Sequence, residues 1–494
     1  MGTLSHSNFL RDYETANSGL KLNPSDLTLQ HKAVLALARM GSLDLACQEY
    51  QKYELDKIRH HEDIMSLGGR LHKDLYLKTV GKNASEHARN AAVKYDAAFR
   101  DTQGFYSGVN AATMALIADM PWDVIQSRID QILNLLPQTQ SHDPAQHYFI
   151  EATRAECLLL QGKKKLAQRA FRNAVNFDPL NYTSHGSTLK QFKMILDKQQ
   201  QNHDWLSEFL PPRPVHYAGH IWSSFQTGSI MTDLSHLIQE HDIGFGYGAL
   251  AAGADIVIAE ALLEEGTELN VTLPSTIDKF LDTSVKPYGK GWMSRCLACL
   301  DEAQTITTLP DNNPQNIDRI RLLAAQMAMG QTIMRSQQLN NSPLQLLLKH
   351  PERRESMVAK HEQDWALTGY DILHMDVSHI VESFPAQPRD FTTIDLRLAT
   401  SESGTVRVFN DLSEAVGAVL MKENKTSSIH FDLMKAQQDV TLLLAENKTN
   451  SIFVTEAVAY FATLKHGSDY NIKFAGLIDK NGTSLRVFTL DVLS

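Results

Sequence analysis

Cysteine is scarce in this sequence, and long uninterrupted apolar runs are missing. The four cysteines among 494 residues are too few for a disulfide framework. The longest apolar run, residues 249–263, contains Asp255 and Glu260 and is too short to span a bilayer. The N-terminus shows no charged-then-apolar signal pattern. We therefore expect a cytoplasmic protein without a membrane partner and exclude a disulfide-rich secreted domain.

Positive charge is also in short supply. The 47 lysines and arginines are outnumbered by 57 acidic residues, which gives a formal net charge of −10. Nucleic-acid-binding surfaces are broadly basic, so no nucleic-acid partner is expected. The hydrophobic content of 43% and the charged content of 21% are ordinary for globular protein. A chain of this length has room for roughly three domains.

Two patterns that could suggest a metal site have simpler explanations. Cys296 and Cys299 form a C-x-x-C pair, but zinc needs four ligands and no second pair has suitable spacing. Both cysteines fall on a helical apolar pattern, which predicts two core cysteines. The His-His-Glu-Asp run at 60–63 predicts a solvated helix face, because adjacent residues on a helix point in different directions.

The N-terminal third contains two segments, 25–55 and 144–179, that share one pattern. In each, a glycine ends one helix, and small residues followed by an aromatic residue lie at helical spacing behind it. The positions are Gly41, Ala46, Tyr50 and Tyr53 in the first segment, and Gly162, Ala167, Phe171, Ala174 and the terminating Pro179 in the second. Such helical hairpins bury their apolar faces only by stacking, so the sequence predicts an α-helical solenoid.

Two further motifs lie between these segments. They are Gly-Arg-Leu-His-Lys-Asp at 69–74 and Gly-Phe-Tyr-Ser-Gly-Val-Asn-Ala-Ala-Thr at 104–113. With the repeats, they resemble the tetratricopeptide-like TRAF-binding domain of certain mitogen-activated kinase kinase kinases, which also occurs in bacterial proteins. The resemblance covers residues 22–200 and implies a helical-repeat domain that contacts a protein partner. No kinase motif accompanies it, and Asn110 is expected to make a hydrogen bond in the repeat core rather than to catalyse.

After the proline-rich segment 211–214, a predicted linker, apolar strands alternate with helices. Strands are predicted at 215–222, 268–274 and 344–348, and helices at 292–303 and 317–338. Alternation with short apolar strands favours a buried parallel sheet. Ligands of such sheets bind beyond the carboxyl ends of the strands.

Residues 244–255, Gly-Phe-Gly-Tyr-Gly-Ala-Leu-Ala-Ala-Gly-Ala-Asp, are the most informative segment of the chain. They are predicted to form a loop that opens a helix, where glycines admit a ligand to the backbone and the helix N-terminus favours a phosphate. Alternatively, the glycines permit close strand-to-helix packing without any ligand. Asp255 either contacts the ligand or holds the loop through backbone hydrogen bonds, and His220 is either a ligand contact or a strand-end residue.

Segment 213–350 resembles the SLOG superfamily, a Rossmann-like group that includes DNA-processing proteins and cytokinin-activating phosphoribohydrolases. The match is nearest to a branch found ahead of bacterial class III cyclase domains. It rests on residues 219–220, the glycine run ending at Asp255, Glu260, 273–274 and 284–285. It implies a nucleotide or nucleotide-derived ligand, with candidate contacts at Gly219, His220, Gly246, Gly248, Gly253 and Asp255. The hydrolytic signature P-G-G-x-G-T-x-x-E is absent, so hydrolysis is not expected.

Residues 366–494 contain predicted strands at 370–378, 404–409, 428–433, 451–456 and 485–488. They resemble a class III adenylate/guanylate cyclase domain, an α+β ferredoxin-like fold. These cyclases need two metal-binding aspartates, because attack on the α-phosphate uses two cations. Asp376 fits the first position as a vestigial metal ligand, whereas Ser403 stands at the second. Thr441 and Ala445 replace the family's Asn and Arg, so no cyclase catalysis is expected.

The sequence therefore predicts a multidomain protein: an all-α helical-repeat solenoid, an α/β Rossmann-like parallel sheet and an α+β cyclase-type domain. We expect a signalling or regulatory protein that binds a nucleotide-type ligand and relays it through protein contacts, with no other cofactor implied. The cyclase-like part could also retain a homodimer surface. Two alternatives remain open, a nucleotide-processing enzyme using His220, Asp255 and Glu260, and a purely structural scaffold. Residual cyclase activity is the least favoured reading.

Overall fold

The structure is a computed structural model that describes residues 9–137, 143–222, 228–309, 317–350, 357–377, 396–400, 406–409, 427–431, 452–466, 470–480 and 483–492. The chain divides into two compact units, Met1–Pro211 and Pro212–Ser494. The boundary falls inside the proline-rich segment 211–214, whose last two residues already belong to the first strand of the C-terminal unit.

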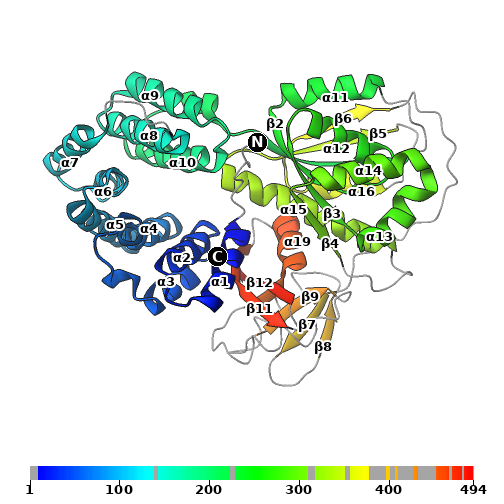
Figure 1. Cartoon of the computed structure of the whole chain (residues 1–494), viewed down its shortest axis with the longest axis horizontal. Helices are drawn as coiled ribbons and strands as arrows, with labels where there is room; N and C mark the ends of the chain where they lie inside the picture. Colours follow the sequence, from blue (N-terminus) through cyan, green and yellow to red (C-terminus); the bar gives the residue numbers. More distant parts are fainter. Residues whose placement is uncertain are drawn as a thin grey trace. The chain divides into compact units, whose positions relative to one another are not determined.

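The N-terminal unit is entirely helical in its described part (Figure 1). Its helices are α1 (Phe9–Leu22), α2 (Leu27–Arg39), α3 (Leu43–Lys52), α4 (Glu62–Lys78), α5 (Gly81–Thr102), α6 (Phe105–Ile117), α7 (Trp122–Leu135), α8 (Pro144–Leu160), α9 (Lys164–Phe177) and α10 (Tyr182–Lys198). Two 3-10 turns, η1 (Leu55–Lys57) and η2 (Asp204–Phe209), complete it. Contacts link α2, α4, α6, α8 and α10 in succession, and α10 also reaches α6. We call the surface formed by these five helices the inner face.

The predicted repeat pattern is confirmed by the turns between paired helices. Gly41 separates α2 from α3 with φ of 79°, and Gly162 separates α8 from α9 with φ of 73°. That left-handed conformation favours glycine and closes the helix before it. Ala46 and Ala167 are completely buried where the paired helices meet. Asp26 and Asp143 cap α2 and α8 by accepting the backbone N–H groups of Leu29 and Ala145.

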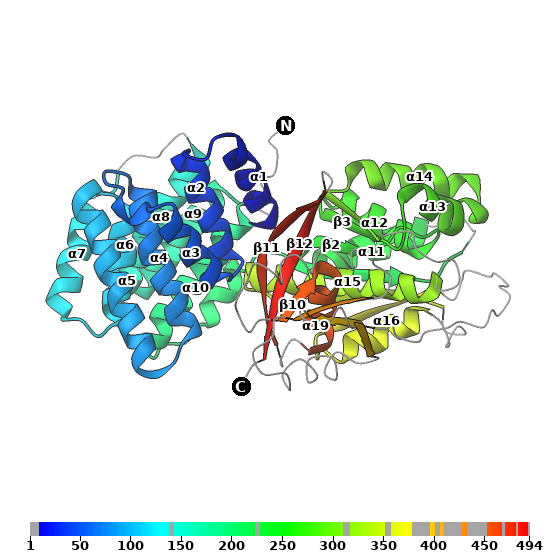
Figure 2. The same cartoon turned by 90° about the horizontal axis from the view of Figure 1, so that it is seen from below.

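The C-terminal unit contains a parallel six-stranded sheet in the order β4-β3-β2-β1-β5-β6. Its strands are β1 (Arg213–Gly219), β2 (Ile243–Gly248), β3 (Glu268–Leu273), β4 (Thr305–Thr308), β5 (Leu344–Lys349) and β6 (Ile372–Asp376). Helices α11 (Gly228–Glu240), α12 (Ala254–Glu264) and α14 (Lys290–Glu302) cover one face, and α15 (Ile317–Leu339) and α16 (Met357–Ala366) cover the other (Figure 2). Short helical turns, α13 (Ile277–Phe280), η3 (Leu281–Val285) and η4 (Lys286–Tyr288), lead into α14. The predicted α/β architecture is confirmed.

Two details differ from the sequence prediction. Residues 244–248 are not a loop but most of strand β2, because they pair with β1 and β3 in the sheet. The loop is confined to 249–253, ahead of α12. The strand that ends at Asp376 pairs with β5 as the sixth strand of the parallel sheet, rather than opening the C-terminal fold. Strand periodicity alone does not report which sheet a strand joins.

A second sheet follows, in the order β11-β12-β10-β9-β7-β8. Its strands are β7 (Leu396–Thr400), β8 (Val406–Phe409), β9 (Ser427–Phe431), β10 (Ile452–Thr455), β11 (Tyr470–Lys480) and β12 (Thr483–Val492). Only β9 and β10 pair in parallel. Helix α19 (Glu456–His466) packs against α15, with Met329, Ile333 and Leu464 in a shared buried cluster. Ser403, Thr441 and Ala445 lie outside the described residues.

None of the helices in the described ranges is both long enough and apolar enough to cross a membrane.

Candidate functional site

In the parallel sheet, the side on which successive strands are added changes between β1 and β5. Strands β2, β3 and β4 extend it on one side of β1, and β5 and β6 extend it on the other. Such a reversal opens a crevice beyond the carboxyl ends of the two central strands. Here the ends are tied together: the His220 N–H donates to the Leu348 carbonyl at 3.2 Å, and the His350 N–H donates to His220 Nδ1 at 2.8 Å. A neutral His220 ring therefore carries its proton on Nε2.

Asp255 connects the end of β1 to the loop before α12. Its Oδ1 accepts the Gly219 N–H at 3.0 Å, and its Oδ2 accepts the Ala251 N–H at 3.2 Å. The residue is only 8% exposed. Burial raises the pKa of this carboxyl to about 7, against the effect of the two N–H donors. Asp255 thus holds the loop through backbone hydrogen bonds, the second of the two roles considered from the sequence, and a ligand contact of Asp255 stays a prediction.

Gly219 and Gly253 let the start of α12 approach the end of β1. A Cβ on Gly219 would lie 2.2 Å from the Ala254 Cβ, and one on Gly253 would lie 2.6 Å from the Trp222 backbone nitrogen. Gly253 also has φ of 99°, a conformation that other residues rarely adopt. The Ala254 N–H donates to the His220 carbonyl at 3.1 Å. The structure therefore brings together four of the six predicted contacts, Gly219, His220, Gly253 and Asp255.

Gly246 and Gly248 serve packing inside β2. A Cβ on Gly246 would lie 2.6 Å from Cδ1 of Leu262, and one on Gly248 would lie 2.6 Å from the ring and 2.7 Å from the backbone oxygen of Tyr217. The space beside both glycines is thus filled by protein atoms. This matches the alternative in which glycines permit close packing, and a ligand contact at these two positions stays a prediction.

The two strand glycines make a matched pair for mutation. We expect Gly246→Ala to change the unfolding free energy by less than about 1 kcal/mol, because the Leu262 side chain can move. Gly248→Ala should cost about 1–3 kcal/mol, because a backbone oxygen cannot be displaced without moving the strand. Thermal unfolding of the two variants measures the difference. Equal losses would contradict a packing role that is specific to Gly248.

A cation that the sequence did not reveal lies beside the loop. Arg321, in the second turn of α15, donates from Nη2 to the Ser284 hydroxyl at 3.3 Å. The Ser284 carbonyl in turn accepts the Ala252 N–H at 3.0 Å. Asp318 lies 3.5 Å from the same guanidinium. No motif marks Arg321 in its helical stretch, since its neighbour Ser284 is 37 residues away in sequence.

Glu260 and Asp376 do not join this site. Both carboxylate oxygens of Glu260 accept hydrogen bonds from the Arg295 guanidinium on α14. Asp376 is exposed at the edge of the sheet, where its backbone pairs with Lys349. Among the described residues no group of three or more His, Cys, Asp or Glu side chains could hold a metal ion. A vestigial metal role for Asp376 stays a prediction.

Cys296 and Cys299 are core residues, as predicted. They are 0% and 1% exposed, and burial raises the pKa of each thiol to about 12. Cys296 Sγ lies 3.7 Å from the Leu250 carbonyl, under the loop. Neither thiol is an accessible thiolate at neutral pH.

The N-terminal unit offers a separate cavity of about 530 Å³ beside η1. Leu55, Ile58 and Met65 supply its apolar wall, and Lys94 and Arg100 of α5 supply cations. Cavities of about 300–1,000 Å³ with an apolar wall and a few polar groups are typical of binding sites.

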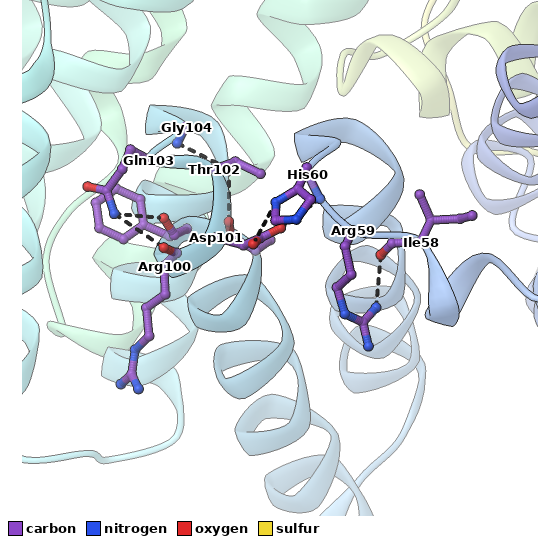
Figure 3. A network of polar contacts seen from close by, with 10 residues as sticks. Ile58, Arg59, His60, Arg100, Asp101, Thr102, Gln103 and Gly104 are labelled. Atoms are coloured by element: carbon purple, nitrogen blue, oxygen red, sulfur yellow. Dashed lines mark hydrogen bonds and ion pairs between the residues drawn. The ribbon is translucent and has the colours of Figure 1, made fainter.

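The rim of this cavity is held by polar contacts (Figure 3). The His60 N–H donates to Asp101 Oδ2 at 2.7 Å, and His60 Nδ1 lies 3.0 Å from Asp101 Oδ1. Arg59 folds back and donates to the Ile58 carbonyl at 2.8 Å. His60 and His61 are exposed, as predicted, but they precede α4 instead of lying on a helix face. Glu62, the first residue of α4, is partly buried and accepts the N–H and the hydroxyl of Ser107.

Comparison with known proteins supports the helical-repeat part. Residues 6–115 match the family described as Tetratricopeptide Repeats-Sensor. A search of the curated proteins finds no match for the chain. Residues 6–115 of the N-terminal unit are therefore tetratricopeptide-like, and stacked repeats of this kind form surfaces suited to protein–protein contacts.

Proposed function

We propose that this protein is a signalling or regulatory protein that binds a nucleotide-type small ligand in the crevice of its C-terminal unit. In this proposal, the helical repeats contact a protein partner, and those contacts change when the ligand binds to the C-terminal unit. The observation that carries the proposal is the convergence of Gly219, His220, Gly253 and Asp255 at the point where the sheet reverses. The similarity to the SLOG superfamily supports a nucleotide or nucleotide-derived ligand.

The electrostatics of the crevice support an anionic ligand. The N-terminus of α12 begins at Ala254, directly behind the loop, and its dipole favours a phosphate. Arg321 places a guanidinium next to Ser284, which is itself hydrogen-bonded to the loop, and guanidinium groups bind phosphate in a fixed, two-donor geometry. The raised pKa of Asp255 reduces the negative charge beside the helix start.

The proposal is tested by titrating the full chain with AMP, ADP and NAD in a calorimeter. We expect Arg321→Gln to weaken binding by at least about tenfold, since a hydrogen bond to a charged group contributes about 1.5–3 kcal/mol. Arg319→Gln is the control, because it makes the same change two residues earlier, on another side of α15. Undiminished binding in Arg321→Gln, or no binding to any of the three ligands, would reject the site.

One observation favours turnover as a second candidate. A buried carboxyl with a pKa near 7 is suited to proton transfer. Against this, both Asp255 oxygens already accept backbone N–H groups, and Glu260 is paired with Arg295. Incubation of wild type and Asp255→Ala with the same ligands decides between binding and turnover: product formed only by the wild type would identify an enzyme.

The second sheet is proposed to be a cyclase-like domain without cyclase activity, and a homodimer surface is proposed for it. Its mixed sheet with α19 is compatible with an α+β fold of that kind. Cyclic nucleotide production from ATP or GTP with manganese would contradict the first part. Light scattering of the full chain at several concentrations tests the second.

A further inference from the structure

The inner face of the N-terminal unit carries a continuous chain of polar side chains from four helices. Lys73 of α4 donates to Asn110 Oδ1 of α6 at 3.1 Å and also to Gln191 Oε1 of α10. Gln191 Nε2 donates to Glu156 Oε1 of α8 at 2.7 Å, and Thr113 Oγ1 donates to the same oxygen at 2.6 Å. We call these five residues the inner-face network. Lys73 belongs to the sequence motif at 69–74, and Asn110 and Thr113 belong to the motif at 104–113.

Cations gather around this network. Arg70 lies three residues before Lys73 on α4 and acts on its pKa, and Lys190 directly precedes Gln191 on α10. The charge of Arg70 also acts on Arg39 of α2 and on Lys190, and Lys193 acts on Lys190. With Lys73 they make five cationic groups, against the carboxylates of Asp12, Asp74 and Glu156. The chain as a whole is acidic, with a net charge of −10, so this positive excess runs against its composition.

The cations repel one another. Burial lowers the pKa values of Arg39, Lys73 and Lys190, and Arg70 lowers each of them further. For Lys73 the pKa falls to about 8. Arg70 stays charged because Asp74 accepts its Nε–H at 2.7 Å. Cations that lower one another's pKa values in this way create a positive potential, which attracts an anion.

The network also has an accessible side. Asn110, Glu156 and Gln191 are 5–7% exposed and form a buried floor. Arg70 and Lys73 are half-buried, and Arg39 and Lys190 are exposed. Arg39, Lys73 and Lys190 come from three helices, and the charge of Arg70 acts on the pKa of all three. A compact polyanion beside Arg70 can therefore meet cations from all three helices.

We propose that the inner-face network and the cations around it form a binding site for a small phosphate-bearing ligand. Arg70 and Lys190 contact the phosphate from two sides, and Lys73 contacts it from the floor. Because the site joins α4, α6 and α10, the bound anion stabilises the packing of successive repeats against one another. This site is independent of the crevice in the C-terminal unit and would make the repeats themselves responsive to a ligand.

Inorganic pyrophosphate is the probe for this site, added to the full chain at low ionic strength. We expect saturable binding by calorimetry that is weakened at least about tenfold in Lys73→Met, which keeps the side-chain length and removes the charge. Lys52→Met on α3, whose side chain is 63% exposed, is the control and should bind as the wild type does. AMP should compete with pyrophosphate, and adenosine should not. Equal binding by Lys73→Met, or no binding by the wild type, overturns the proposal.

A second measurement needs no variant. Lysine acetylation by a limiting amount of acetic anhydride is followed by mass spectrometry with and without pyrophosphate. We expect pyrophosphate to protect Lys73 and Lys190 and to leave Lys52 unchanged. Protection should persist in Arg321→Gln, which separates this site from the proposed nucleotide site. Bound pyrophosphate without protection of Lys73 or Lys190 would overturn the assignment.

Discussion

Replacing Gly330 by valine is expected to force α19 away from α15 and to cost about 3 kcal/mol or more of unfolding free energy in the C-terminal unit. A Cβ at this position would lie 2.4 Å from the backbone oxygen of Tyr460 and 2.8 Å from its carbonyl carbon. A backbone group cannot rotate out of the way as a side-chain tip can. The two helices would have to separate along their whole contact.

That contact links the parallel sheet to the second sheet. Met329, Ile333, Trp365 and Leu464 share one buried cluster at the junction. Next to it, Asp364 of α16 is 1% exposed, accepts a hydrogen bond from Gln326 at 2.7 Å and pairs with Lys465 of α19. Separation of the helices would expose the apolar cluster and remove Lys465 from the buried Asp364 carboxylate, which would keep only Lys360 of its own helix, at 3.1 Å, as a cation. Loss of one partner of a buried ion pair is destabilising.

Hydrogen exchange of peptides from α15 and α19 measures the effect. We expect both helices to lose protection in Gly330→Val. Gly228→Val at the start of α11 is the control, since a Cβ there meets no atom within 4 Å. If Gly330→Val keeps the protection of α19, the two sheets are not coupled through this crossing.

Local sequence signals predicted the elements well where one residue decides the geometry. Gly41 and Gly162 adopt the left-handed conformation that ends a helix, and the strand at 344–348 is a short apolar run between polar residues. The prediction of a loop at 244–248 is wrong for a related reason. Glycine suits a loop and a tightly packed strand equally, and the choice depends on Tyr217 and Leu262, which the local sequence does not place beside it.

The candidate sites show the same limit. Gly253 and Asp255 lie two residues apart in sequence and are identifiable from it. In contrast, Arg321 meets Ser284 across 37 residues, and Lys73 meets Gln191 across 118. These pairings form only when the helices and the sheet pack together, so the spacing of residues in the sequence cannot predict them. The membership of β6 in the parallel sheet is equally a product of assembly.

Asp255 makes the stability of the loop before α12 depend on pH. Its pKa is raised by burial from 3.8 to about 7, so the folded state keeps a proton that the unfolded chain has already lost over that range. Unfolding then releases a proton, and raising the pH favours unfolding. The stabilisation is complete below pH 3.8 and is lost as the pH rises through about 7. Since one pKa unit corresponds to about 1.4 kcal/mol, the loss is up to about 4 kcal/mol in total.

Asp255→Asn removes the titration while keeping the shape of the side chain. Its amide oxygen still accepts one of the two N–H groups. The variant is therefore less stable than the wild type at acidic pH, but its free energy of unfolding does not fall through this group as the pH approaches 7. The buried His361, whose pKa is lowered by burial to about 4, acts in the opposite sense, because its contribution is lost as the pH falls from 6.5 through about 4. His361 is present in both proteins, so its effect cancels in their difference.

The measurement is hydrogen exchange of peptides covering 215–222 and 249–256 in both proteins at matched pH values. Between about pH 5 and pH 7, the opening free energy of the wild type relative to Asp255→Asn should fall by up to about 1.4 kcal/mol per pH unit. A constant difference would show that the Gly219 and Ala251 N–H groups keep the carboxylate ionised throughout this range. In that case Asp255 would be a fixed negative charge at the helix start, and the crevice would disfavour a phosphate close to it.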